Sequence, residues 1–399
     1  MKAGWTKTTL GAAFTTATGG TPAKSNESFY GDFIPLVKPP ELRDSELDSA
    51  EDGLSEAGAS VARIAPLHSI LVSCIGNLGK VGLNTIPVAF NQQINAIFPD
   101  GDKALPSFML YQAQSCSFKE QLESLASGTT VPIVNKSKFN SIEIVLPPLS
   151  EQQRIVAILD EAFEAIAAAR ANAEQNRQNS RALFESYLQS VFSQRGDRWV
   201  ETTIGNQVDF LAGFAFKSTQ YTESKDGIRL IRGDNIVQGQ LRWDGVKYLA
   251  RTSAENYSQF YFEENDIVLA MDRPWVAAGL KVACITKNDL PALQVQRTAR
   301  LRVKPNLHWK YLFHMIRSSK FVTYLLDGQT GLGVPHISGK QILSFEFALP
   351  PLNEQQLIVQ KLDALGDKTQ RLESLYQRKI AALDELKQSL LQQAFSGQL

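Results

Sequence analysis

Two short stretches of the 399-residue chain concentrate side chains that can hydrogen-bond in pairs to a planar edge. The first stretch supplies Asn91, Gln92, Gln93 and Asn95, and the second supplies Gln294, Gln296, Arg297 and Arg300. Asparagine and glutamine match the donor and acceptor of adenine, and arginine matches the two acceptors of guanine, with about 1–3 kcal/mol of discrimination per pair. The alternative is that these side chains only satisfy backbone groups at strand edges and turns.

Four further cations are candidates for contacts with phosphate, which would position a nucleic acid without identifying its sequence. They are Lys80, Arg232, Arg273 and Lys281. The formal net charge of the whole chain is zero, but residues 1–149 carry 11 basic and 14 acidic side chains, whereas residues 199–352 carry 18 and 14. Charge alone therefore leaves nucleic-acid binding undecided.

Motifs that would indicate catalysis are missing from the sequence. Gly79-Lys80 lacks the glycine that a phosphate-binding P-loop has five residues earlier, because Cys74 stands there. The four histidines are not spaced as a metal-binding set, and neither a Gly-x-Ser-x-Gly elbow nor an Asn/Asp-Pro-Pro-aromatic motif occurs. The sequence favours binding over catalysis and predicts no metal site.

The candidate residues sit in a chain that repeats itself. Residues 146–160 read LPPLSEQQRIVAILD and residues 349–363 read LPPLNEQQLIVQKLD, with 11 of 15 positions identical at an offset of 203. The segments before these stretches are also related, since Trp5-Thr6-Lys7-Thr8-Thr9-Leu10-Gly11 matches Trp199-Val200-Glu201-Thr202-Thr203-Ile204-Gly205. A repeat of this length indicates duplication of a whole unit.

Each LPPL stretch predicts the start of a long helix. Ser150 and Asn353 are suitable N-caps, and apolar residues then recur at spacings of four and three, which is typical of a coiled coil. At 1.5 Å per residue each helix would be roughly 60 Å long. The duplication favours packing of the two helices on each other, while two unrelated solvated helices or a homodimer seam are the alternatives. The predicted seam comprises Ile155, Leu159, Ile166, Leu183, Ile358, Leu362, Leu372 and Leu386.

Four segments follow from these boundaries: a first globule at residues 1–149, a helix at 150–198, a second globule at 199–352 and a helix at 353–399. In the globules, Ile70–Ser73 and Ile267–Ala270 predict strands, and the alternation in residues 90–97 and 293–301 predicts half-exposed strands. Residues 107–126 and 309–326 predict helices. The predicted fold class is α+β, with two duplicated mixed α/β globules separated by two long helices that form an antiparallel coiled coil.

Cellular location follows from what the sequence omits. Cys74, Cys116 and Cys284 are odd in number and far apart, which suggests no disulfide framework. No signal peptide and no apolar run of membrane-spanning length is present. We expect a cytoplasmic protein that does not bind membranes.

The paired LPPL-x-EQQ-x-IV helix starts, the paired globules and the Gly79-Lys80-Val81 turn resemble a type I restriction–modification specificity subunit with two target-recognition domains. The resemblance covers essentially the whole chain. It implies a non-catalytic subunit that recognises an asymmetric, two-part site in double-stranded DNA, one half per globule.

The resemblance also implies partners for the helices. Two methylation subunits would dock there, joined by restriction subunits where a nuclease is present. The predicted docking residues are Glu151, Gln152, Gln153, Glu354, Gln355 and Gln356. S-adenosylmethionine, and ATP and Mg²⁺ for restriction, would be held by the partners, and this chain would bind no cofactor. A free-standing DNA-modifying enzyme and a coiled-coil protein scaffold are the alternatives.

Overall fold

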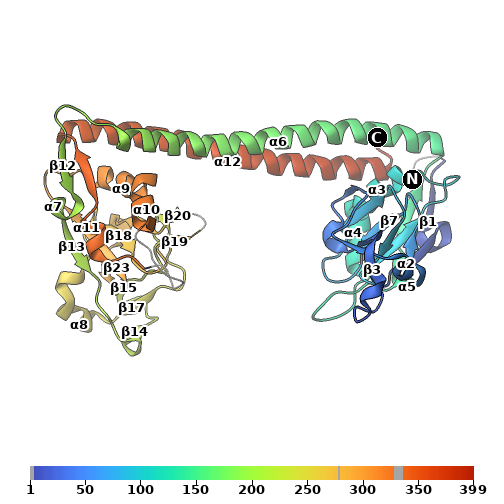
Figure 1. Cartoon of the computed structure of the whole chain (residues 1–399), viewed down its shortest axis with the longest axis horizontal. Helices are drawn as coiled ribbons and strands as arrows, with labels where there is room; N and C mark the ends of the chain where they lie inside the picture. The colour runs from blue at the N-terminus through green and yellow to red at the C-terminus, as the bar shows by residue number, and fades with distance from the viewer. Residues whose placement is uncertain (1–3, 277–278, 328–335) are drawn as a thin grey trace. The chain divides into compact units, whose positions relative to one another are not determined.

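A computed structural model describes residues 4–276, 279–327 and 336–399 (Figure 1). The chain forms two compact units, one of residues 1–175 with 376–399 and one of residues 176–375. Each unit contains one globule, part of the long helix α6 (Leu149–Ser193) and part of the long helix α12 (Leu352–Ser396). The predicted fold class, two mixed α/β globules with two long helices, is confirmed.

The first globule is built on a five-stranded sheet in the order β2-β10-β7-β8-β4. Its strands are β2 (Thr15–Thr18), β10 (Ile94–Phe98), β7 (Ile70–Ser73), β8 (Val81–Asn84) and β4 (Ser45–Leu47). A four-stranded sheet joins β5 (Asp52–Leu54), β3 (Tyr30–Val37), β9 (Val88–Phe90) and β6 (Ile64–Ala65), and a ribbon joins β1 (Thr6–Thr9) to β11 (Glu143–Leu146). The helices are α1 (Leu10–Ala13), α2 (Glu56–Val61), α3 (Pro106–Gln114), α4 (Cys116–Ser124) and α5 (Lys136–Asn140).

The second globule repeats this plan in the order β13-β23-β18-β21-β16. These strands are β13 (Val208–Ala212), β23 (Thr298–Val303), β18 (Ile267–Ala270), β21 (Val282–Cys284) and β16 (Gln238–Gly239). Its other strands are β14 (Tyr221–Thr222), β17 (Lys247–Leu249), β15 (Ile228–Ile231), β22 (Ala292–Gln294), β12 (Val200–Thr203), β24 (Glu346–Leu349), β19 (Trp275–Val276) and β20 (Gly279–Leu280). The helices are α7 (Ile204–Gln207), α8 (Arg251–Ala254), α9 (Trp309–Arg317), α10 (Ser319–Asp327) and α11 (Gly339–Leu343).

The two five-stranded sheets share their strand directions. In each, three antiparallel pairings are followed by one parallel pairing, β4 with β8 in the first globule and β16 with β21 in the second. The parallel pair β3–β9 likewise matches β15–β22. The duplication inferred from sequence is therefore a duplication of topology.

Two local predictions were wrong in the same way in both globules. Residues 90–97 and 293–301 are not continuous strands, because residues 91–93 and 295–297 form turns. The strands on either side of these turns are not half-exposed either, since nearly all of their residues are buried. The alternating polar residues in these stretches are turn residues or buried side chains with hydrogen-bond partners. The predicted helices 107–126 and 309–326 are each broken in two, at Ser115 and Ser318, whose hydroxyls donate to the carbonyls of Gln112 and Met315.

Helices α6 and α12 pack antiparallel within each unit. In the first unit Arg154 donates to the Leu399 carbonyl at 2.7 Å and Arg170 pairs with Asp384 at 3.0 Å, so later positions in α6 meet earlier positions in α12. In the second unit Arg181 pairs with Glu373 at 3.4 Å. Both helices begin one residue earlier than predicted, which places Ser150 and Asn353 inside the first turn and not at the N-cap.

The predicted seam is right near the helix starts and wrong further along. Ile155, Leu159, Ile166 and Leu362 are buried and Ile358 is half-buried, whereas the seam members Leu183, Leu372 and Leu386 are exposed. After Ala173 the covered positions of α6 are 177, 180, 184 and 187, so a second step of four follows the step from 169 to 173. Two successive steps of four shift the apolar stripe by one residue relative to a strict heptad, as in an 11-residue repeat.

The helices contribute to the core of both globules at positions related by the offset of 203. In the first globule's core Ile155 and Leu159 of α6 join Leu391 and Ala394 of α12. In the second globule's core the helix residues are Leu188, Val191 and Phe192 of α6 with Val359 and Leu362 of α12. The edge-to-face ring pair Phe108–Phe395 is matched by Tyr311–Phe192, each with 5.2 Å between ring centroids. Burial of the same positions twice explains why the helix sequence is repeated.

An ion pair fastens the second globule to α12. Asp363 accepts a hydrogen bond from His314 of α9 at 2.9 Å and also pairs with Lys310. The His314 hydrogen bond, with help from Lys310, lowers the pKa of Asp363 to about 2, although partial burial opposes the shift. Because the carboxylate is favoured in the folded state, its stabilisation is present above pH 4 and is lost as the pH falls towards 2.

We therefore expect Asp363→Asn to remove about 1 kcal/mol of stability at neutral pH, a value reduced for the partial exposure of the carboxylate. The variant should also show a flatter stability profile between pH 4 and 2. Tryptophan fluorescence during unfolding measures this, because four of the five tryptophans belong to the second unit. Asp367→Asn, at an exposed position of the same helix, is the control. An unchanged pH profile in Asp363→Asn would show that this pair does not stabilise the unit.

Candidate nucleic-acid interface

The turn at residues 295–297 of the second globule is fixed by backbone hydrogen bonds to three neighbouring segments. Val295 N donates to the Ile231 carbonyl at 3.1 Å, Gln296 N to the Phe214 carbonyl at 2.7 Å, and Met271 N to the Arg297 carbonyl at 2.9 Å. A Cβ at Gly213 would lie 2.0 Å from the Val295 carbonyl oxygen, so only glycine allows this approach. We call residues 295–297 the second turn.

The first globule holds residues 91–93, which we call the first turn, by two equivalent backbone hydrogen bonds. Asn91 N donates to the Val37 carbonyl at 3.0 Å, and Cys74 N donates to the Gln93 carbonyl at 2.7 Å. Gly19 stands where the second globule has Gly213, and a Cβ there would lie 2.2 Å from the Asn91 carbonyl oxygen. Gln93 is thus the structural counterpart of Arg297, and the two candidate clusters predicted from sequence occupy equivalent places.

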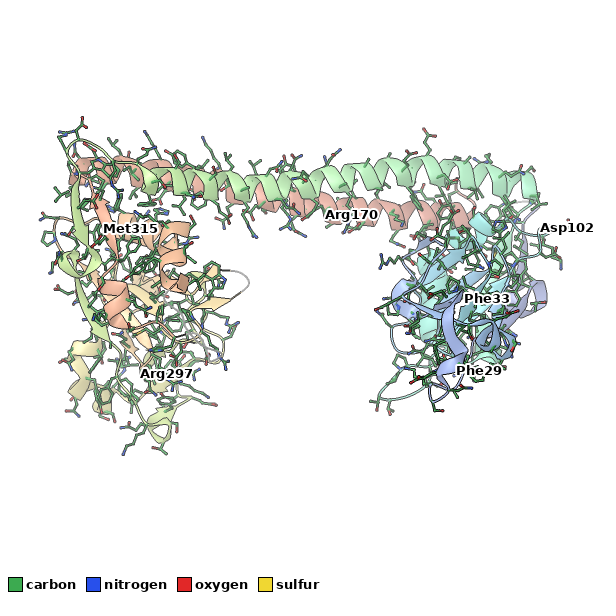
Figure 2. The ribbon with its side chains drawn as sticks, viewed as in Figure 1. Phe29, Phe33, Asp102, Arg170, Arg297 and Met315 are labelled. Atoms are coloured by element: carbon green, nitrogen blue, oxygen red, sulfur yellow. The ribbon has the colours of Figure 1, made fainter. Side chains whose placement is uncertain are left out.

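An open groove of about 730 Å³ runs beside the second turn. It gathers five of the residues predicted to contact nucleic acid, from segments far apart in the sequence: Arg232, Arg273, Lys281, Gln296 and Arg297. The other lining residues are Tyr221, Gly233, Asp234, Asp272, Val295 and His336. In Figure 2, Arg297 lies on the part of the second globule remote from the helix ends on which that globule packs.

The charge of this groove is positive on balance. Four cations line it against the carboxylates of Asp234 and Asp272, and Asp272 is engaged by Arg297 at 2.9 Å and by His336. Burial lowers the pKa of Lys281; among the nearby charges, Asp234 opposes the shift while Arg242 and Arg273 add to it. A crowded, partly desolvated cation such as Lys281 is stabilised by an anion such as phosphate.

Backbone strain marks two of these cations. Arg273 and Arg297 have φ of 44° and 64°, in the left-handed region that residues with a Cβ rarely adopt. The isolated bridge Asp272–His336 matches the bridge Ile75–Ile133 of the first globule, which aligns Arg273 with Gly76, whose φ is 75°. The second globule has an arginine where the first has a glycine, which adopts this backbone conformation without strain. Backbone strain of this kind is concentrated at functional sites.

Four other predicted contact residues are buried. Asn95 accepts from the Thr18 hydroxyl at 2.6 Å, Gln294 donates to the carbonyls of Leu211 and Thr298, and Arg300 donates to those of Gln259 and Tyr261. Asn91, 6% exposed, donates to Gln93. These four side chains satisfy neighbouring protein groups, the alternative use recognised at the outset, so they correct the predicted interface.

The first globule presents fewer cations at its turn. Gln92 is exposed and accepts a hydrogen bond from the Thr21 hydroxyl, while Gln93 and Lys80 are half-exposed. Lys80 is the counterpart of Lys281: Ser73 N donates to the Lys80 carbonyl, as Ala270 N does to the Lys281 carbonyl. Sequence reasoning missed Lys38, which is the counterpart of Arg232. Lys38 pairs with Asp52. The offset of 194 between Val37 and Ile231 could have identified it.

The residues predicted to dock partners have different environments. Gln152 is fully buried: its amide donates to the carbonyls of Lys103 and Pro147, both at 2.9 Å, and its carbonyl accepts from Leu105 N at 2.9 Å. Gln355 makes the same three bonds 203 positions later, to Asn306, Pro350 and His308. We call this arrangement the glutamine clamp.

The glutamine clamp uses Gln152 and Gln355 within the chain, which removes them from the predicted docking surface. Glu151 pairs with Arg154, and Glu354 pairs with Arg198 and accepts from the Trp199 indole at 2.9 Å. Of the six predicted docking residues, Gln153 and Gln356 are the ones with exposed side chains.

Two features are absent from the described residues. Across residues 4–276, 279–327 and 336–399, no three side chains of His, Cys, Asp or Glu gather in a way that could hold a metal ion. Within the same residues no helix has a stretch both long and apolar enough to cross a membrane.

The fold and the site define a protein made of two copies of one globule-and-helix module, each presenting a turn between equivalent strands, β9 and β10 in the first copy and β22 and β23 in the second. The family model for the type I restriction modification DNA specificity domain matches residues 2–175 and again residues 197–381. The chain therefore belongs to this family and carries its domain twice. Members of this family are recognition subunits and not the catalytic ones, in agreement with the prediction from sequence.

Two similar proteins are named as specificity subunits of type I restriction enzymes. The MjaVIII specificity subunit of Methanocaldococcus jannaschii is 27% identical over 371 residues, covering 84% of this chain and 85% of that protein. The EcoAI specificity subunit of Escherichia coli is 37% identical over 168 residues, 42% of this chain and 28% of that protein.

Two solved structures share the fold over the full length of this chain. One is a chain from work on complex assembly and conformational transition of the type I R-M system; it has a TM-score of 0.83 at 19% identity, covering 100% of this chain and 99% of that one. The other is the HsdS subunit of Thermoanaerobacter tengcongensis, with a TM-score of 0.62 at 19% identity, covering 100% of this chain and 98% of that one.

The glutamine clamp yields a prediction about stability. Gln152→Leu would leave one buried N–H and two buried carbonyls without partners, so we expect the free energy of unfolding of the first unit to fall by about 2–4 kcal/mol. Denaturant unfolding, with hydrogen exchange at Leu105, measures the effect. Gln153→Leu, one residue along and exposed, is the matched control, and Gln355→Leu with Gln356→Leu repeats the test in the second unit. Equal losses in Gln152→Leu and Gln153→Leu would contradict a structural role for the clamp.

Proposed function

We propose that this chain is the DNA-recognition subunit of a type I restriction–modification complex and recognises a two-part site in double-stranded DNA, one half per globule. The observation that supports this most strongly is the pair of equivalent turns, which share two backbone hydrogen bonds but carry different side chains. Two copies of one scaffold with different side chains at the contact would recognise different half-sites. The whole site is then asymmetric.

Affinity for the DNA backbone would come mainly from the groove of the second globule. Arg232, Arg273 and Lys281 are placed there to contact phosphates, which fixes position without identifying bases. Gln296 and Arg297 of the turn, and Gln92 and Gln93 of the first turn, are the side chains offered to base edges.

Methylation subunits would dock on the exposed faces of α6 and α12. Besides Gln153 and Gln356, these helices expose several leucines, an arrangement that is costly in water unless a partner covers it. They are Leu183, Leu357, Leu372, Leu375 and Leu386. The partners would supply the chemistry: S-adenosylmethionine on two methylation subunits, and ATP with Mg²⁺ where restriction subunits join. This chain would perform no catalytic step.

The alternatives predict different outcomes. A protein scaffold would assemble with partners but retain no DNA, and a free-standing enzyme would turn over as purified chain supplied with S-adenosylmethionine, Mg²⁺ and ATP. The groove lined by four cations, together with the exposed side chains of the second turn, favours DNA recognition over the scaffold.

Exchange of one globule tests the two-part model directly. We expect a complex in which residues 1–149 are replaced by those of a relative to methylate a site with one half changed and the other half retained. Mapping of methylated bases across a genome that carries the exchanged chain gives the result. The parent complex is the control, and simultaneous change of both halves would refute the assignment of one half to each globule.

Removal of a strained cation separates stability from binding. We expect Arg273→Gly to keep or raise stability by up to about 1 kcal/mol, because glycine adopts a left-handed backbone without strain. DNA binding by the assembled complex should weaken on all sequences alike, and the slope of log affinity against log salt should fall by about 1. Lys340→Gln, an exposed cation outside the groove, serves as the control for net charge. An unchanged slope for Arg273→Gly would exclude Arg273 from the phosphate contacts.

A further inference from the structure

We propose that Arg297 identifies a guanine in the half-site bound by the second globule, that Asp272 positions it, and that the first globule has no such guanine contact at its turn. This inference rests on the proposed function and adds the base chemistry of each half. It follows from what surrounds the two equivalent turn residues, Arg297 and Gln93.

The guanidinium of Arg297 is displayed at the groove with one edge in use. Its side chain is 70% exposed, and Nη1 lies 2.9 Å from a carboxylate oxygen of Asp272. That contact leaves the edge formed by Nε and Nη2 available. A guanidinium edge with two parallel N–H groups matches the N7 and O6 acceptors of guanine, the most common specific contact between a side chain and a base.

Asp272 is itself held from the opposite side. One of its oxygens meets Arg297 and the other meets Nδ1 of His336, and its backbone bridges to that of His336. A carboxylate fixed between two partners cannot follow the arginine as it moves. Asp272 therefore restricts the directions in which Arg297 can point, which is the preorganisation that a specific contact needs.

The backbone also favours a side-chain role for Arg297. Its φ of 64° is left-handed, whereas Gln93 is not among the left-handed residues of the first globule. Two of the backbone hydrogen bonds are shared by both turns, and the second turn adds the bond from Gln296 N to the Phe214 carbonyl. Strain of this kind is concentrated at functional sites, and at Arg297 it accompanies a side chain that lines the groove.

The first globule has different chemistry at each of these positions. Ile75 and Ile133 stand where the second globule has Asp272 and His336, and Ile133 is 41% exposed. Gln93, in place of Arg297, accepts from the Asn91 amide and keeps its own N–H groups available. A glutamine amide suits adenine, and an exposed isoleucine suits the thymine methyl group. The contacts at the first turn therefore fit an adenine–thymine pair.

The test uses the assembled complex with its methylation subunits and a library of randomised DNA from which methylated molecules are sequenced. The parent should require guanine at one position of the second half-site. Arg297→Asn keeps a residue that tolerates the left-handed backbone, so folding is preserved. It should lose about ten- to a hundredfold of the preference for guanine at that single position and leave the first half-site unchanged.

A second variant separates positioning from contact. Asp272→Asn should keep guanine as the preferred base and reduce its preference several-fold, because Arg297 is still present but less restrained. Gln93→Asn is the matched control in the first globule: it should alter only the first half-site. Loss of methylation by Arg297→Asn on all sequences equally would mean that Arg297 contacts phosphate, and the inference would fail. It would also fail if no guanine were required in the second half-site.

Failure of this inference can be told from failure of the proposed function. If exchange of residues 1–149 changes one half-site while Arg297→Asn changes no base preference, recognition by two globules stands and the role of Arg297 falls. If the parent library shows no two-part site, the proposed function falls, and the role of Arg297 falls with it.

Discussion

One buried side chain in each module holds the rest in place. Gln152 and Gln355 sit in the first turn of their helices and bind the backbone of the loop that leads into α3 or α9. A fully buried amide with three partners cannot shift without leaving polar groups unsatisfied, so the angle between globule and helix is fixed locally. The apolar contacts that follow, Ile155 and Leu159 in the first module, extend this attachment into the core.

Against this constant frame the two turns have diverged. Two backbone hydrogen bonds to residues 91–93 are repeated at residues 295–297, while neighbouring residues change from Gly76 to Arg273 and from Ile75 to Asp272. The first globule also neutralises Lys38 with Asp52. Differences gather where a ligand would be contacted, and identities gather where the chain contacts itself. Duplication followed by divergence of the contact surface accounts for both.

Sequence reasoning worked where a periodic or repeated pattern had one physical cause. Strands β7 and β18 were predicted to the residue because a short, largely apolar run of four residues next to a turn is buried on both faces. The seam failed beyond Ala173, since a heptad extended by counting cannot show a second step of four, and Leu183 was placed where Phe184 is. The predicted contact residues also included amides that are buried, because the sequence does not show whether protein or solvent supplies the hydrogen-bond partners of Asn95 and Gln294.

The incorrect predictions of contact residues and the proposed function both depend on how the polar side chains of the repeated stretches are used. Polar side chains in the repeated stretches are used in two ways, to satisfy the backbone in the interior and to face the groove, and only tertiary contacts separate Gln294 from Gln296. The same separation makes the module adaptable. The glutamine clamp, the glycines at 19 and 213 and the helix contacts fix each turn without its exposed side chains. Substitutions at Gln93 or Arg297 would therefore change the side chains that we propose contact bases while the packing of the helices is unchanged.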